Sequence, residues 1–498
     1  MGLVGTVGLG CALALVTAGR ASSQSGSQDA ITGLRTTIDA AADTNAGAAP
    51  PPPAPGEADG SRSTMDPWGP QDGALPPDAA ATGNPPRAGV APGATTSPAS
   101  AGAGSGVPYA NPPRHKAAPE ADLFAAPGLR LGSFVLRPAI EVWSGYDSNP
   151  ARVPAGRSSS LLVVSPELQM TSDWERHAVT ANIRGSYMDY PSVGIADRPS
   201  LDARVGGRID VTRDSRIDLE GRDLVGTDYP GSPNIGPDIA RLPIFDTVGG
   251  TLGVGQRFNR IDVSLKGTID RTVWQPSQLI DGTSSSNRDR DLNQYGAQLR
   301  TSYELTPGLK PFLELDVDSR VHDLALDRSG LARDSHGTAP RGGSTFELSP
   351  LLTGEISVGY LTRLYRDPNL PDLKGLIADG SLVYAVTPLT SMKLVAKSVA
   401  DESVVPGVSG LFRRDAEVDV DHAFRRWLVG TAKLGYGVDD YTGSGRTDRR
   451  YLASAGLTYK LTRTTQIKGE LREEWLRSSV PGQDYTATVA MIGLRYQR

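Results

Sequence analysis

The stretch from Leu411 to Phe424 alternates between two kinds of side chain. Its apolar positions are Phe412, Ala416, Val418, Val420 and Phe424. Its charged positions are Arg413, Asp415, Glu417, Asp419 and Asp421. Successive side chains of a strand point to opposite faces, so this strand has one apolar and one densely charged face. A soluble sandwich rarely gathers five charges on one face of a strand, whereas a transmembrane barrel around a wet lumen does so naturally. Phe412 and Phe424 lie where the aromatic girdles of such a barrel are expected.

The same alternation recurs from Gly132 onward, and no segment after residue 130 shows a helical period. Connections alternate in length between short turns, such as Asn259-Arg260, and longer segments rich in Pro, Gly, Asp and Ser, such as 228–243. Short periplasmic turns that alternate with longer extracellular loops are typical of outer-membrane barrels with both termini in the periplasm. We therefore predict an all-β fold, a transmembrane antiparallel β-barrel of about 18 strands. Sixteen is the alternative, because 220–250 and 340–352 are the hardest to assign.

Composition agrees with this class. The 498 residues are only 38% hydrophobic, and after the N-terminus no stretch approaches the roughly 20 apolar residues of a membrane helix. Low hydropathy does not oppose a barrel, because only alternate residues face lipid. The net charge of −5 argues against a nucleic-acid partner, which usually requires a basic surplus.

The N-terminal region differs in composition from the rest. Residues 1–21 are mainly apolar and predict a signal peptide, although the usual preceding positive charges are missing, so the true start could lie upstream. Cys11 is the single cysteine, and its surroundings match a lipoprotein acylation site poorly. Residues 22–127 are rich in Pro, Ala and Gly and predict a disordered periplasmic segment, either a plain spacer or a tether for a partner. The barrel is expected over 128–498.

Charges at the predicted lumen-facing positions are the candidate functional residues. They are Arg413, Asp415, Glu417, Asp419, Asp421, Glu314, Asp316, Asp318, Arg320, Lys468, Glu470, Arg472 and Glu474. A wall of salt bridges is the plain interpretation, and unpaired charges at a constriction would instead tune solute selectivity. The longest predicted connection, 323–343, is the best candidate for an infolded constriction loop.

Two arginines break the apolar pattern. Arg271 and Arg414 fall on the lipid-facing set, but each lies near a predicted extracellular end, where a long cationic side chain can reach the interface at little cost. Glu473 is a third exception, for which the sequence offers no account. The last strand, Tyr485–Arg498, alternates poorly in polarity.

Catalytic and metal-binding patterns are absent from the sequence. The five histidines have no local spacing with Ser and an acid that would favour a hydrolase. The acidic stretch 281–291 does not have the spacing of a calcium loop. We therefore predict no enzyme, no cofactor and no metal site.

Several segments resemble a known family. They are Phe134–Asn149, Gly354–Tyr360, Tyr365–Pro368, Leu373–Gly375, Thr387–Thr390 and Val404–Gly407. Their order is similar to that of the outer-membrane β-barrel porin group often called the beta-barrel porin 2 family, over roughly 130–498. The resemblance implies an outer-membrane location and a pore, and it supplies no catalytic residues. One departure is that Gln497 and Arg498 follow Tyr496, whereas barrels of this kind often end on an aromatic residue.

A passive channel for small hydrophilic solutes is the leading functional hypothesis. The alternatives are an exopolysaccharide-export or envelope-assembly component whose tail docks in the periplasm, and a mostly closed structural barrel. A sugar conduit would favour aromatic lumen residues, and only a few, such as Trp274 and Phe312, are expected there. The expected partners are outer-membrane lipid and lipopolysaccharide, the outer-membrane assembly machinery and, for the tail, a periplasmic protein.

Overall fold

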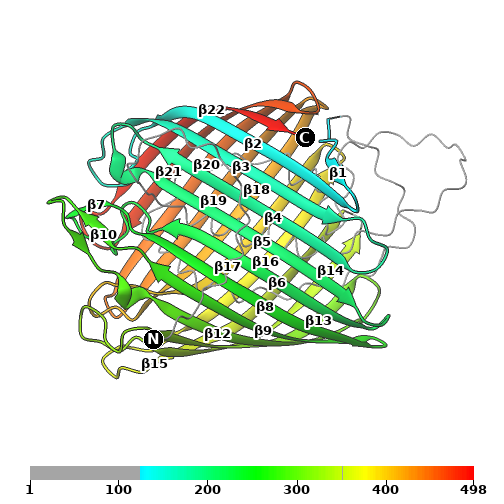
Figure 1. The fold of residues 1–498 in the computed structure, drawn as a ribbon, viewed down its shortest axis with the longest axis horizontal. Helices are drawn as coiled ribbons and strands as arrows, with labels where there is room; N and C mark the ends of the chain where they lie inside the picture. Colours follow the sequence, from blue (N-terminus) through cyan, green and yellow to red (C-terminus); the bar gives the residue numbers. More distant parts are fainter. Residues whose placement is uncertain (1–123, 350) are drawn as a thin grey trace, which may run out of the picture.

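The computed structural model describes residues 124–349 and 351–498, and most of this part is β-strand (Figure 1). Nineteen strands form one antiparallel sheet, and all except the short β1 (Leu129–Leu131) close into a barrel of 18. The 18 strands are β2 (Phe134–Asp147), β3 (Ser159–Ser172), β4 (Ala178–Asp189), β5 (Arg198–Asp210), β6 (Ser215–Thr227), β8 (Ile244–Phe258), β9 (Ile261–Trp274), β12 (Leu292–Tyr303), β13 (Leu309–His322), β14 (Ser335–Ser349), β15 (Leu352–Tyr365), β16 (Leu373–Thr387), β17 (Thr390–Asp401), β18 (Gly410–Arg425), β19 (Leu428–Thr442), β20 (Arg446–Lys460), β21 (Thr465–Ser478) and β22 (Tyr485–Gln497). The predicted fold class and strand number are confirmed.

Each strand pairs with the next one along the chain, and β2 closes the barrel against β22. This closing register runs from Ala139 opposite Gln497 to Asp147 opposite Val489. At its end, the backbone N–H of Arg498 donates to the carbonyl oxygen of Pro138 (3.0 Å). A closed antiparallel sheet satisfies its backbone groups between strands, which is the condition for a strand to cross lipid.

The connections divide the barrel into a long-loop end and a short-turn end. The long-loop end carries a small sheet of β7 (Ile239–Arg241), β10 (Ser277–Leu279) and β11 (Ser284–Ser285), together with the 3₁₀ turns η2 (Gly194–Ala196) and η3 (Arg288–Arg290). In Figure 1 this end is on the left, and β1 and the C-terminus are on the right. The predicted loop 323–343 is wrong in extent, because β14 begins at Ser335 and leaves a connection of 323–334.

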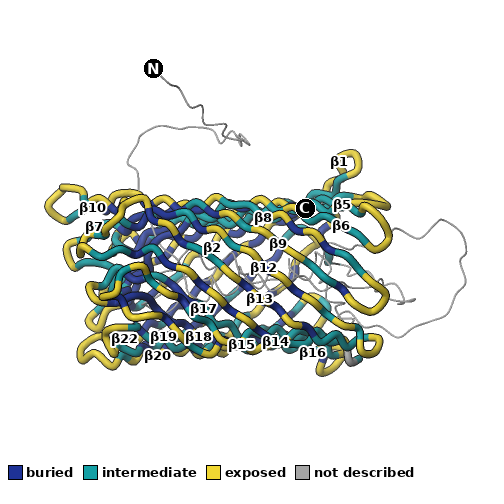
Figure 2. Tube along the Cα trace, turned by 90° about the horizontal axis from the view of Figure 1, so that it is seen from below, coloured by how far each residue is buried: buried dark blue, intermediate teal, exposed yellow. Residues whose placement is uncertain are grey.

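Alternation of exposure separates the two faces of the wall. In β13, Leu313 is 73% exposed, whereas the neighbouring Glu314 is 4% exposed. The exposed apolar set faces outward, toward lipid, and the polar set faces the interior. Figure 2 shows the buried stretches gathering toward the long-loop end, where β7 and β10 lie.

Aromatic pairs mark two levels on the outer face. Tyr436 and Tyr451 pack near the long-loop end, with ring centroids 5.2 Å apart, and Trp427 and Tyr459 pack near the short-turn end at 5.0 Å. Between Tyr451 and Tyr459, β20 advances about 26 Å along its length, or about 20 Å across the membrane at a tilt near 40°. The two levels therefore fit the girdles that border an outer-membrane apolar band.

The sequence predictions for the girdle and the N-terminal region have different outcomes. Phe424 is exposed as a girdle residue should be, but Phe412 is buried. Within the described ranges, no helix is long and apolar enough to cross a membrane. The predicted signal peptide lies outside the described residues, as does all of the predicted disordered segment before residue 124.

Candidate functional site: the lumen and its mouth

All thirteen predicted lumen charges lie on the inner face of the barrel wall. Asp318, Asp419 and Asp421 are half-buried, and the other ten are buried. Each lies between two neighbours of the opposite, outward-facing set, as the alternation requires. In the structure these thirteen side chains therefore share the face opposite the exposed apolar set.

Arginines join the inner charges of neighbouring strands into networks. Arg341 lies 3.4 Å from Glu314, 2.9 Å from Asp316 and 2.7 Å from Asp379. Because a buried carboxylate without a partner is strongly destabilising, these shared cations hold β13, β14 and β16 together.

A second network lies on β18, β19 and β20. Arg450 lies 2.6 Å from Asp415 and 2.7 Å from Asp439, and Arg413 lies 3.2 Å from Asp439 and 3.1 Å from Asp401. Lys433 pairs with Glu417 and lies 3.4 Å from Asp419. The wall of salt bridges considered from the sequence is thus present, with both signs of charge.

The barrel closure has its own network, which sequence reasoning missed. Glu141 of β2 accepts from Lys468 of β21 (2.5 Å) and from Arg495 of β22 (2.7 Å), and Arg495 also lies 2.8 Å from Glu167 of β3. Glu141 and Arg495 belong to strands whose inner faces are otherwise largely apolar, so their charges were not recognised as part of a pattern.

One connection crosses the mouth of the barrel, and we refer to residues 402–409 as the crossing loop. Glu402, at its start, lies 3.3 Å from Arg320 and 3.1 Å from His322, both on β13. Arg333 donates to the carbonyl oxygens of Ser403 (2.6 Å) and Val408 (3.1 Å). The crossing loop is therefore fixed to β13 and to the connection 323–334 rather than only to its own strands.

The crossing loop also reaches the opposite wall. Asn234 Oδ1, in the connection between β6 and β8, accepts from the Ser403 hydroxyl and the Val404 backbone N–H, each at 3.1 Å. The wall at the β6–β8 connection and the wall at β17–β18 are far apart around the barrel. On one side they are separated by β9 and β12–β16, and on the other by β2–β5 and β19–β22. The contact therefore spans the mouth.

Electrostatics stabilise this arrangement. Burial alone would raise the pKa of the Glu402 carboxyl, but the charges of His322, Arg320 and Arg333 outweigh burial and hold that pKa well below its usual range. Glu402 therefore remains ionised and paired at neutral pH.

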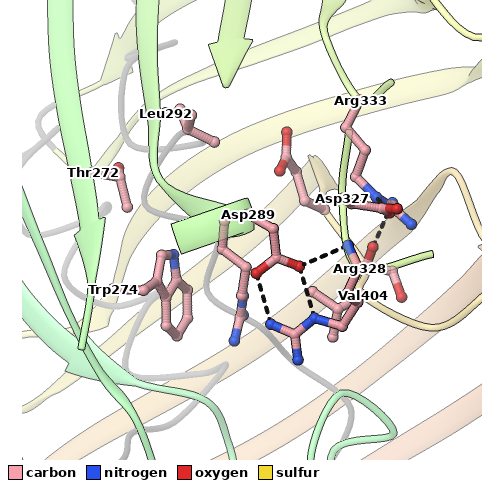
Figure 3. Close-up of a pocket in the computed structure, with 11 residues that line it drawn as sticks. Thr272, Trp274, Asp289, Leu292, Asp327, Arg328, Arg333 and Val404 are labelled. Carbon is pink, nitrogen blue, oxygen red and sulfur yellow. Dashed lines mark hydrogen bonds and ion pairs between the residues drawn. The ribbon is translucent and has the colours of Figure 1, made fainter. Parts of the chain in front are cut away.

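A pocket lies beside the crossing loop (Figure 3). Trp274 forms one wall of the pocket, and the Arg290 guanidinium stacks over its ring, 3.3 Å from the ring centroid. In Figure 3, Asp289 faces Arg328 across the pocket, and their closest ion-pair distance is 2.7 Å. Burial raises the pKa of Asp289, but the hydrogen bonds and charge of Arg328 outweigh burial and lower it. The pocket is a small cavity lined by residues of three connections and of β9 and β12.

The wall behind the crossing loop contains a gap in strand pairing. The β16–β17 ladder ends where Gly380 lies opposite Ala396, although β16 continues to pair with β15 and β17 with β18. Above that point Ser398 replaces the ladder: its hydroxyl accepts from the Ala378 N–H (3.0 Å) and donates to the Ala378 carbonyl (3.2 Å). β17 therefore leaves β16 before it enters the crossing loop.

Side chains of β18 seal this gap. Phe412 is 2% exposed and packs with Ala339, Leu373, Ile377 and Ala400. On the inner side, Arg320 donates to the Ala400 carbonyl oxygen (3.0 Å). This explains why Phe412 is not a girdle residue: it fills the space that the missing ladder leaves.

The outward-facing arginines have partners that the sequence did not reveal. Arg271 pairs with Asp323 (2.5 Å) and Arg414 with Asp440 (2.8 Å), both near the long-loop end. Glu473 Oε2 accepts a hydrogen bond from the Thr488 hydroxyl at 2.6 Å. This bond satisfies one carboxylate oxygen of Glu473 on the outer face. None of the described residues form a cluster of three or more potential metal ligands.

Comparisons with known proteins place the chain in a family. The model described as "Putative beta-barrel porin 2" matches residues 122–498. No curated protein matches the sequence. Among solved structures, the chain is similar to the outer-membrane protein OpdK of Pseudomonas aeruginosa, with 14% identity, a TM-score of 0.38, and coverage of 73% of this chain and 99% of that one.

Two other solved barrels have comparable similarity. A BenF-like porin from Pseudomonas fluorescens shows 10% identity and a TM-score of 0.40, with 74% and 100% of the two chains covered. A bacterial polysaccharide outer-membrane secretin shows 12% identity and a TM-score of 0.31, with 73% and 98% covered.

Proposed function

This chain belongs to the putative beta-barrel porin 2 family, and on that premise we propose that its lumen is a passive channel for small hydrophilic solutes. The protein is a porin-like outer-membrane barrel. The observation that carries the proposal is the inner wall, on which charged and polar side chains occupy most strands, although an apolar cluster around Trp143 lies near the closure of the barrel. Such a wall favours water and hydrophilic solutes over apolar ones.

The crossing loop supports a size limit for this channel. It spans the mouth from β17 to Asn234 and is held there by Arg333 and by the Glu402 pairs. Residues 402–409 therefore replace the predicted 323–343 as the constriction. The inner-wall charges nearest to it, Asp401, Arg413 and Arg320, are the candidates that tune solute selectivity.

The orientation follows the general topology of outer-membrane barrels. Long loops face the exterior and short turns face the periplasm, so the short-turn end, with β1 and the C-terminus, would lie in the periplasm. Lipid and lipopolysaccharide surround the outer face, and the assembly machinery would insert the barrel.

The lumen offers little support for the rival role in polysaccharide export. The two aromatic residues singled out from the sequence are not available for stacking on sugars. The Arg290 guanidinium covers Trp274, and the Arg300 guanidinium lies 3.5 Å from the centroid of the Phe312 ring. Both rings are committed to cations of the wall.

Single-channel conductance of the full chain in a planar bilayer tests the proposal. We expect stable, ohmic steps, and the reversal potential under a salt gradient gives the charge preference. Liposome swelling with uncharged sugars of increasing size should show a sharp cut-off. A folded, heat-modifiable barrel that does not conduct would contradict the channel. Comparison with residues 128–498 tests whether the preceding segment blocks the pore.

A further inference from the structure

Three arginines form one row on the lipid-facing side of the barrel. In the strand register, Arg414 of β18 lies opposite Val438 of β19, Val438 opposite Arg449 of β20, and Arg449 opposite Arg477 of β21. All three arginines are exposed. They lie near the long-loop end, and the adjoining connection between β19 and β20 consists only of 443–445, so the row is not covered by a long loop.

An aromatic row lies one step farther from the long-loop end. Tyr436 lies opposite Tyr451, and Tyr451 lies opposite Trp475, on the same three strands β19, β20 and β21. Aromatic side chains at this level mark the boundary of the apolar band. The arginine row therefore lies at the depth of lipid headgroups.

The charges of the row are incompletely balanced. Arg414 forms an ion pair with Asp440 at 2.8 Å. Arg477 forms a longer ion pair with Asp484, at 3.8 Å, and the side chains of Arg477 and Asp484 are about half exposed. Arg449 has no ion pair among the described residues. Arg449 and Arg477 are direct cross-strand neighbours, and like charges in that position repel. An anion placed between them would relieve this repulsion.

We propose that Arg449 and Arg477 bind a phosphate group of lipopolysaccharide in the outer leaflet of the outer membrane. Two arginines at paired positions of adjacent strands offer several guanidinium N–H donors, which suit phosphate oxygens. Tyr451 and Trp475, directly beneath, would contact the start of the acyl chains. The assignment to lipopolysaccharide rather than phospholipid rests on the proposed orientation, in which the long-loop end faces outward.

Titration of the full chain in detergent with lipid A that carries both phosphates tests the site. The Arg449→Gln/Arg477→Gln double variant should bind this lipid about tenfold more weakly or worse, because it loses charge-assisted hydrogen bonds. The Arg449→Lys/Arg477→Lys variant should lie between the two, since it keeps the charge and loses the paired donors. Arg366→Gln is the matched control, an exposed arginine at the same end that should bind like the wild type.

Dephosphorylated lipid A and phosphatidylglycerol identify the ligand. The wild type should bind dephosphorylated lipid A weakly, with no difference between wild type and double variant. Equal affinity of the double variant and the wild type for the diphosphorylated lipid overturns the site. If phosphatidylglycerol binds as tightly as lipid A and is weakened by the same variants, the assignment to lipopolysaccharide is wrong. Heat-modifiable migration on a gel shows whether each variant is folded. If the Gln double variant does not fold, the comparison of the Lys double variant with the wild type tests the site.

Discussion

Glu402 is the residue at which Arg320 and His322 of β13 meet the crossing loop. Its carboxylate oxygens lie within 3.3 Å of Arg320 and 3.1 Å of His322, and the loop beyond it extends to Asn234 on the far wall. A single ionised side chain therefore connects the lumen wall to the segment that narrows the mouth. Because Arg333 and Asn234 also hold the crossing loop, we expect protonation of Glu402 to weaken that connection rather than to abolish it.

Replacement of this carboxylate should loosen the mouth. In Glu402→Gln the neutral amide loses the negative charge that pairs with Arg320 and His322, so the crossing loop should leave its position more often. We expect a larger or more fluctuating single-channel conductance than in the wild type. Asp372→Asn is the control, because within the described residues Asp372 forms an ion pair with the exposed Lys374, at the same end, and with no other side chain. An unchanged conductance in Glu402→Gln would exclude a role for this pair.

The wild type should show the same effect at acid pH. The pKa of Glu402 lies below its ordinary value of 4.5 while the loop is in place, and returns toward 4.5 when the loop is released. A lowered pKa stabilises the closed arrangement above about pH 4.5, and this stabilisation is lost as the pH falls below that value. Conductance recorded from pH 6 to pH 3 should therefore rise in the wild type and stay level in Glu402→Gln.

At the scale of elements, β14 shows where sequence patterns succeed and where they fail. Alternation and connection lengths predict about 18 strands, because the order of polar and apolar residues within each strand indicates which of its faces meets lipid. β14 contains His336, Gly337, Pro340 and two further glycines, a composition that predicts a loop over its first half. It is a strand because β13 and β15 pair with it on both sides, which no local pattern reports.

The crossing loop could not be predicted for a related reason. Its position depends on Asn234, Arg320 and Arg333, which belong to three other parts of the chain and come together only after the barrel closes. The thirteen lumen charges, in contrast, needed only the period of two. Sequence thus determined which face a side chain occupies, and the closed structure determined which partner it finds.

The interrupted pairing between β16 and β17 makes Ser398 important for stability. Ser398→Ala removes the hydroxyl that satisfies both the N–H and the carbonyl of Ala378. We expect the free energy of unfolding to fall by about 1–3 kcal/mol, measured by urea unfolding in lipid vesicles. Ser160→Ala, at an exposed serine of β3, should leave it within about 0.5 kcal/mol. Equal stability of the Ser398 and Ser160 variants would show that the gap does not depend on this hydroxyl.

At the scale of the whole molecule, the barrel is closed by charge as well as by backbone pairing. Glu141 lies between Lys468 and Arg495 where the first barrel strand meets the last two. All three side chains are buried. Because the partners of a buried carboxylate become uncompensated when it is removed, this position should be among the most sensitive in the wall.

Glu141→Gln leaves two buried cations without their shared anion. We expect a loss of about 3–5 kcal/mol in the free energy of unfolding and a lower yield of heat-modifiable protein. Glu175→Gln, in an exposed turn at the short-turn end, should refold like the wild type. If the two variants fold with the same yield and stability, the closure depends on backbone pairing alone.

The pairing of β2 with β22 also has a consequence for how the chain reaches the membrane. Until Ala139 meets Gln497, both β2 and β22 are free sheet edges, and such edges readily join to other chains. The last pairing is the one most distant in sequence, so the vulnerable state persists until the whole polypeptide has been made. A chain of this design therefore exposes two unpaired strand edges for as long as the barrel is incomplete, and closure removes both of them at once.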